Sequence, residues 1–185
     1  MRATSDTLTV HLHGMFRDVL RDGRGGVISD SGWQKNAIVA DCRRLLAGFL
    51  RGAPTGVQGI QGLQVGAGLA AWDQPPGPPP ASSGQVALVD AHPFTVERNN
   101  LQMHYLVGDA VSGSPTNRLQ IVATLGPGVP PWPERPEVIH PTSTLREFGL
   151  IAQLDGAPVL INYRTHPAIV KDPASTLERT IWLVF

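Results

Sequence analysis

Apolar and polar residues alternate in several short stretches of the chain, and a period of two is typical of a half-buried β-strand. In the stretch 118–126, for example, Leu119, Ile121 and Ala123 fall on one face. The segments predicted as strands are residues 7–13, 60–66, 85–90, 100–108, 118–126 and 176–185. Residues 21–32 are polar and rich in glycine, which predicts a loop.

The period changes to that of an α-helix in residues 32–52. Apolar side chains recur there at helical spacing, at Ile38, Cys42, Leu45, Leu46 and Phe49. Gly52 and Pro54 follow as stop signals. We expect one helix, whose apolar stripe packs on a sheet.

Residues 144–162 predict a β-hairpin, because two apolar runs flank Asp155-Gly156, a dipeptide typical of a type I′ turn. The hairpin opens with the charged pair Arg146-Glu147, followed by Gly149. Gly149 would let a neighbouring backbone approach closely. Arg146 and Glu147 could pair with each other, reach a neighbouring strand or subunit, or form an exposed pair of little energetic value.

The 185 residues suit one domain, and 20 glycines and 17 prolines make up a fifth of them. Such a composition favours a β-rich scaffold with many turns. Residues 73–84 and 127–143 are proline-rich and are predicted as extended loops, because proline lacks the donor that a central strand needs. The predicted fold class is α+β, mainly β: an antiparallel β-sandwich or mixed sheet with one packed helix.

Net charge is zero, with 15 basic and 15 acidic residues, so nothing favours a nucleic-acid partner. No apolar run approaches the roughly 20 residues that cross a bilayer, and the first residues lack the apolar core of a signal peptide. With the single cysteine Cys42, synthesis in a reducing cytoplasm is expected. A protein of this kind would leave its cell by lysis or inside a particle.

Catalytic motifs are not found in the sequence: it has no phosphate-binding loop, no Gly-x-Ser-x-Gly and no His-Glu-x-x-His. Cys42 lies in the apolar stripe of the helix and is expected to be an inert buried thiol. His11 and His13 share a strand face, but the sequence brings no further ligand to them. We therefore expect no metal, no cofactor and no enzymatic activity.

Three short motifs occur in a characteristic order: Val65-Gly66 with Gly68, Arg146-Glu147 with Gly149-Leu150, and Pro167 with Lys171. This order, over roughly residues 33–185, resembles small virion proteins of tailed bacteriophages and of related contractile injection particles. It is most similar to the particle-attaching N-terminal domain of tail-collar fibre proteins. The proline-rich loops, and the lack of a long trimeric shaft after residue 185, depart from that family.

The resemblance implies a non-enzymatic structural protein: an adaptor, baseplate or collar component of the virion, working by subunit assembly. Implied partners are other tail proteins and further copies of the chain in a ring. Alternatives are a receptor- or carbohydrate-binding module at the tail tip, a head–tail neck protein, and an enzyme whose catalytic site cannot be recognised from the sequence.

The tryptophans and one proline-rich loop supply further candidate contacts. Trp132, between prolines, could pack on its own domain or dock into a neighbour. The partner-binding candidates are Trp132, Val138, Ile139, Arg146, Glu147 and Trp182.

Overall fold

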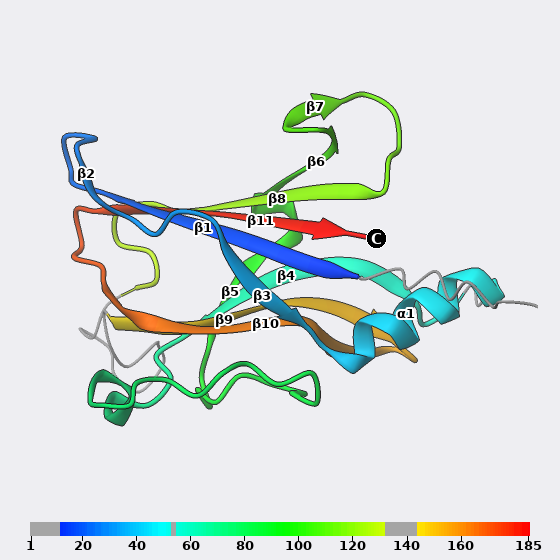
Figure 1. Ribbon diagram of the computed structural model, residues 1–185, viewed down its shortest axis with the longest axis horizontal. Helices are drawn as coiled ribbons and strands as arrows, with labels where there is room; N and C mark the ends of the chain where they lie inside the picture. Colours follow the sequence, from blue (N-terminus) through cyan, green and yellow to red (C-terminus); the bar gives the residue numbers. More distant parts are fainter. Residues whose placement is uncertain (1–11, 53–54, 132–143) are drawn as a thin grey trace, which may run out of the picture.

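The computed structural model describes residues 12–52, 55–131 and 144–185, and in this part of the chain every strand pairing is antiparallel. One sheet runs in the order β5-β4-β9-β10-β3-β1-β11-β8-β6-β7, with β2 attached to β1. The sheet folds over on itself into two layers (Figure 1). The predicted mainly β fold with one helix is therefore confirmed, as an antiparallel sandwich and not a mixed sheet.

The upper layer in Figure 1 contains β1, β11, β8, β6, β7 and β2, and the lower layer contains β4, β9 and β10. The strands are β1 His13–Arg21, β2 Val27–Asp30, β3 Gln34–Ile38, β4 Gln58–Gly66, β5 Phe94–Glu97, β6 Leu101–Val107, β7 Ala110–Ser112, β8 Arg118–Leu125, β9 Thr144–Leu154, β10 Ala157–Val170 and β11 Thr176–Val184. Strand β3 joins the layers, since residues 34–36 pair with β1 and residues 37–38 pair with β10.

The core lies between the layers and is built from the alternate apolar positions of the strands. The rings of Phe16 on β1 and Phe148 on β9 meet edge to face across it, with centroids 5.1 Å apart. Ile121 and Leu125 on β8, and Ile181 and Leu183 on β11, are buried as the alternation predicts.

The hairpin of residues 144–162 forms as predicted by β9 and β10, with Asp155-Gly156 at the turn. Both turn residues have positive φ, 54° and 78°, which is the type I′ conformation. Gly149 also fulfils its expected role: a Cβ there would lie 2.7 Å from the carbonyl oxygen of Asn162 on the paired strand.

The helix α1 spans Ala40–Arg51, so the prediction that it begins near residue 32 is wrong. The segment Gln34–Ile38 is strand β3, because its backbone links two other strands. Gly52 ends the helix with φ 74°, as predicted. Cys42 and Leu45 are buried, but Phe49 is 48% exposed, so the apolar stripe is only partly covered.

Two other segments differ from expectation. Residues 85–90 form no strand, because only Leu88 turns inward while Val86 is 73% exposed. The glycine-rich stretch 21–32 contains strand β2, which forms a hairpin with β1. No helix in the described ranges is long and apolar enough to span a membrane.

Candidate functional site

The charged pair at the entrance of β9 is buried, so an exposed pair is excluded, and its two members face different partners. The Arg146 guanidinium makes a two-pronged ion pair with Asp73, from Nε to Oδ1 at 2.8 Å and from Nη2 to Oδ2 at 2.5 Å. Its Nη1 donates to the carbonyl of Ala67 at 2.9 Å. The hydrogen bonds with Arg146 lower the pKa of Asp73, and Asp73 in turn raises the pKa of Arg146.

Glu147 is fully buried and accepts three hydrogen bonds. The backbone N–H groups of Val89 and Asp90 donate to its two oxygens at 3.0 and 2.7 Å. The hydroxyl of Tyr163, on β10, donates to Oε2 at 2.6 Å. Burial and this carboxylate raise the pKa of Tyr163 well above its usual value.

These contacts hold the long loop of residues 67–93 on the outer face of the lower layer (Figure 1). We call Asp73, Arg146, Glu147 and Tyr163 the loop clamp. Two glycines leave room for the clamp and the loop: a Cβ on Gly66 would lie 2.8 Å from Glu147 Oε1, and one on Gly68 would lie 2.4 Å from the Trp72 ring of the loop and 3.2 Å from the Cβ of Arg146. The glycine motif and the Arg-Glu motif, far apart in sequence, thus form one unit inside the chain.

Replacing Glu147 with glutamine will weaken the loop clamp. The amide offers an N–H₂ group where one of the backbone donors needs an acceptor, and leaving a buried donor unpaired costs about 1–3 kcal/mol. We expect that loss of unfolding free energy in urea titrations, and faster proteolysis within residues 85–93. The control is Glu178→Gln at an exposed position of β11. Equal behaviour of the two variants would contradict the clamp.

A second buried ionic unit lies inside the sandwich. Arg179 on β11 has no exposed surface, and its Nε and Nη2 each donate to the Asp18 carboxylate of β1 at 2.7 Å. Nη2 also lies 3.1 Å from Nε2 of His166, and the guanidinium stacks 3.9 Å from the centre of the Phe148 ring.

The histidine of this unit has both ring nitrogens engaged. Because a guanidinium only donates, Nε2 of His166 is the acceptor. Its Nδ1 therefore carries the proton and donates to the carbonyl of Pro167 at 2.8 Å. Burial, and then the Arg179 charge, lower the pKa of His166 to about 4.

A cavity of about 230 Å³ lies beside this unit and is lined by Asp18, His166 and Ser31. These residue types occur in hydrolases, but the Ser31 hydroxyl accepts from the Asp18 backbone N–H and donates to the carbonyl of Gly32, both at 2.8 Å. A histidine without a free nitrogen cannot take a proton from it. The arrangement is that of a structural ion pair.

His166 should make the fold sensitive to mild acid. An unfolded histidine has a pKa near 6.5, so between about pH 6.5 and pH 4 the unfolded chain binds a proton that the folded chain does not. Stability is therefore lost as the pH falls through this window, by about 3 kcal/mol in total. Urea titrations at pH 7 and pH 4.5 measure it. The variant His166→Gln should show a smaller loss than the parent protein, and an equal loss would contradict the assignment.

The remaining candidates from the sequence are placed as follows. Trp182 is half-buried on the outer face of β11, where its ring packs against Trp33 with centroids 4.0 Å apart, and its Nε1 donates to Gln120 at 3.0 Å. Trp132, Val138 and Ile139 lie outside the described residues. So does His11, and no group of potential metal ligands occurs among the residues described.

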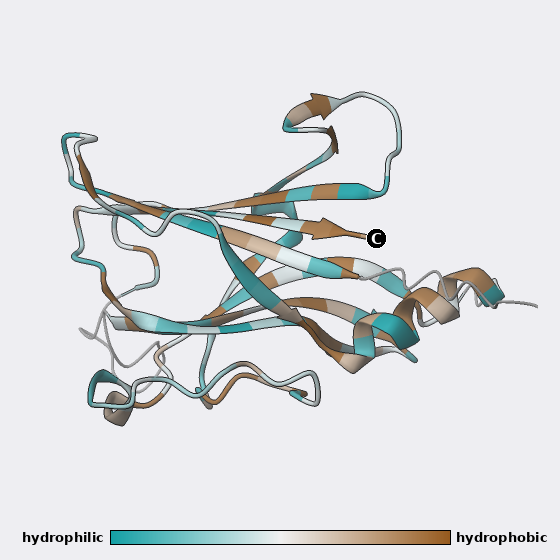
Figure 2. Ribbon diagram, viewed as in Figure 1, coloured by the Kyte–Doolittle hydropathy of each residue, from teal (hydrophilic) through white to brown (hydrophobic). Residues whose placement is uncertain are grey.

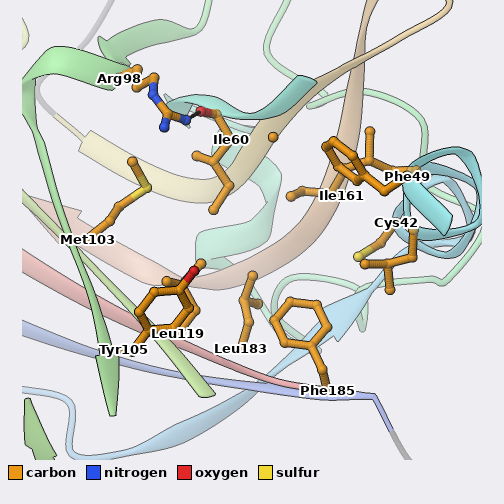
Figure 3. Close-up of a pocket in the computed structure, with 13 residues that line it drawn as sticks. Cys42, Phe49, Ile60, Arg98, Met103, Tyr105, Leu119, Ile161, Leu183 and Phe185 are labelled. Carbon is orange, nitrogen blue, oxygen red and sulfur yellow. Dashed lines mark hydrogen bonds between the residues drawn. The ribbon is translucent and has the colours of Figure 1, made fainter. Parts of the chain in front are cut away.

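An apolar cleft of about 360 Å³ opens where the two layers separate. One wall is helix α1, with Cys42, Leu45 and Phe49, and the other is the upper layer, with Tyr105 and Leu183 (Figure 3). Burial raises the pKa of the Cys42 thiol to about 11, so this cysteine is an unreactive part of the wall.

The rim of the cleft exposes large apolar side chains. Phe49 is 48% exposed and Tyr105 is 40% exposed, while Val107 and Val111 on the adjoining β6–β7 hairpin are more than 60% exposed. Figure 2 shows apolar residues along α1, at the right of the view, and on β7, at the top. The sequence pattern did not identify this site, because it assigned Phe49 to the packed stripe of the helix. The one sequence signal was the excess of apolar residues in the last turn, where Phe49 is followed by Leu50.

In comparisons with known proteins, the chain matches no protein-family model, no curated protein and no solved structure. The resemblance to tail proteins therefore gains no support from these comparisons.

Proposed function

We propose that this chain is a non-enzymatic structural protein of a phage tail or phage-like contractile injection particle. It serves as an adaptor, baseplate or collar component that assembles with other particle proteins and with further copies of itself. The observation that supports this most is the apolar cleft with its exposed rim. Soluble monomers rarely leave a large contiguous apolar surface open, and such a surface is typical of a protein–protein contact.

The other functional classes have weaker support. An enzyme needs a free base or nucleophile, whereas His166 and Ser31 are both engaged within the chain. A sugar-binding module presents an open aromatic face and polar groups beside it. Here Trp33 and Trp182 pack on each other, and the Trp182 N–H is bonded to Gln120.

The proline-rich segment 127–143 is part of this proposal as an assembly arm. Its first residues are tied to the domain, since the N–H of Gly128 donates to the carbonyl of Pro173 at 2.8 Å. Strand β9 begins directly after it, at Thr144. Six prolines stiffen the segment, which lowers the entropy cost of binding it in an extended form. Trp132, Val138 and Ile139 are its apolar anchors.

The test follows the tagged chain in the cells that encode it. We expect it to sediment with particles and to label them in immunogold microscopy. A variant with residues 132–139 replaced by a Gly/Ser linker of equal length leaves Val129 and the buried Pro130 in place, so it should keep its melting temperature and be lost from particles. A chain that never enters a particle fraction would refute the function. Normal incorporation of the linker variant would refute the arm alone.

A further inference from the structure

We propose that the apolar cleft receives the β1–β2 hairpin of a second copy of this chain, so that copies join head to tail. The inference rests on the proposed assembly function and names the partner of the same cleft. It is carried by a projecting apolar element that the chain presents at its other end.

That element is the hairpin between β1 and β2. All four residues of β2 are exposed, and its first two, Val27 and Ile28, are 56% and 54% exposed. Among the described residues β2 pairs only with β1, so its outer edge is open. Adjacent exposed apolar side chains on a projecting hairpin are typical of a contact surface, and insertion into an apolar cleft would bury them.

The hairpin is held in one conformation by its own hydrogen bonds. In its turn, the Asp22 carboxylate accepts from the N–H groups of Arg24 and Gly26, both at 2.8 Å. The Asp22 N–H donates to the carbonyl of Gly26 at 2.8 Å. At the base, Arg17 on β1 pairs with Asp30 on β2. A preorganised element loses little conformational entropy on binding.

The cleft and the hairpin lie at opposite ends of the long axis. In Figure 1, β2 is at the far left, while α1 and the chain's last residue, which both line the cleft, are at the right. Two different surfaces therefore meet, which makes the contact heterologous. Such contacts build closed rings, or filaments where the rotation does not close.

Two variants of the full chain test this contact from its two sides. The hairpin variant is Val27→Ser with Ile28→Ser, at exposed positions. The cleft variant is Gly59→Phe: Gly59 lines the cleft and has no atom within 4 Å of an added Cβ, so the ring would fill the space. Should Gly59→Phe fail to fold, Phe49→Asp on the exposed rim takes its place. The matched control is Val170→Ser, 63% exposed on β10.

Sedimentation velocity and native mass spectrometry over a concentration series give the readout. We expect the parent chain and the control to form oligomers, and each variant alone to associate at least roughly tenfold more weakly. An equal mixture of the two variants should form one-to-one dimers and nothing larger. In such a dimer the intact hairpin of the cleft variant occupies the intact cleft of the hairpin variant.

A parent chain that stays monomeric, variants that assemble like the parent, or a mixture that does not pair would overturn the inference. The hairpin contact and the proposed particle role can be refuted independently of each other. A chain found in particles but monomeric in isolation would refute the hairpin contact alone. A chain that joins head to tail but never enters a particle would refute the particle role alone.

Discussion

Removal of residues 181–185 should leave a chain that no longer melts cooperatively. Ile181 and Leu183 are buried, and each contributes about 1.5–3 kcal/mol by burial. Strand β11 lies between β1 and β8, so the deletion also breaks pairing on both sides, including the positions opposite Phe16 and Ile121. These losses approach the whole stability of a small domain, about 5–15 kcal/mol. Circular dichroism during heating measures the result.

The matched control removes Phe185 alone. This residue is half-buried, and its backbone exchanges two hydrogen bonds with Asn117, at 2.9 and 3.1 Å. The shorter deletion should still fold and melt a few degrees lower, roughly in proportion to the smaller loss. A chain lacking residues 181–185 that melts near the parent temperature would show that this strand is dispensable.

The sequence pattern was most informative where local chemistry and burial agree. The hairpin of residues 144–162 could be predicted because Asp155-Gly156 suits the positive φ values of the turn and apolar runs flank it. Strands β8 and β11 could be predicted because one face of each packs in the core. In these segments, turn propensity and alternation both specify the same structure.

Long-range hydrogen bonding determines the structure of the segments that were predicted wrongly. Helical periodicity continues through Ile38, but the backbone of residues 34–38 bonds to β1 and β10, which overrides the local pattern. Residues 85–90 contain enough valine and leucine for a strand. Their N–H groups at Val89 and Asp90 are instead used by a carboxylate 57–58 positions away.

The candidate site was predictable only in part. The Arg146-Glu147 motif could be singled out from its position, but its role could not, because Asp73 and Tyr163 are brought to it by the fold. The cleft could not be predicted at all. It results from the separation of two layers at their end, and no periodicity in a single segment reports how far apart two layers lie.

Two ionic contacts connect distant parts of this chain: Arg179 with Asp18, which is buried, and Arg146 with Asp73, in which only the arginine is buried. Burying charges costs desolvation energy, which paired partners offset only when their geometry is good. Both contacts are two-pronged, so each guanidinium matches one carboxylate in one orientation. We infer that these ion pairs mainly fix the relative positions of the segments they join. Arg146 with Asp73 positions the loop of residues 67–93, and Arg179 with Asp18 positions β1 against β11.

Replacing Asp18 with alanine should therefore be severely destabilising. Arg179 would keep a charge with no exposed surface, and its remaining neighbours, the His166 ring and the Phe148 ring, carry no negative charge. Breaking one side of a buried pair costs about 3–5 kcal/mol, measurable as a lower urea midpoint at unchanged slope.

The double variant Asp18→Leu with Arg179→Met tests whether the ion pair serves to fix the position of the two strands or contributes net stability. It removes both charges and keeps apolar volume, and such replacements are often neutral or stabilising. We expect it to recover most of the stability lost in Asp18→Ala. The exposed pair of Arg17 on β1 and Asp30 on β2 serves as the comparison, and Asp30→Asn should change stability much less. If Asp18→Ala were as mild as Asp30→Asn, the Arg179 charge would have to be solvated in the folded chain, and the burial assigned to this pair would be wrong.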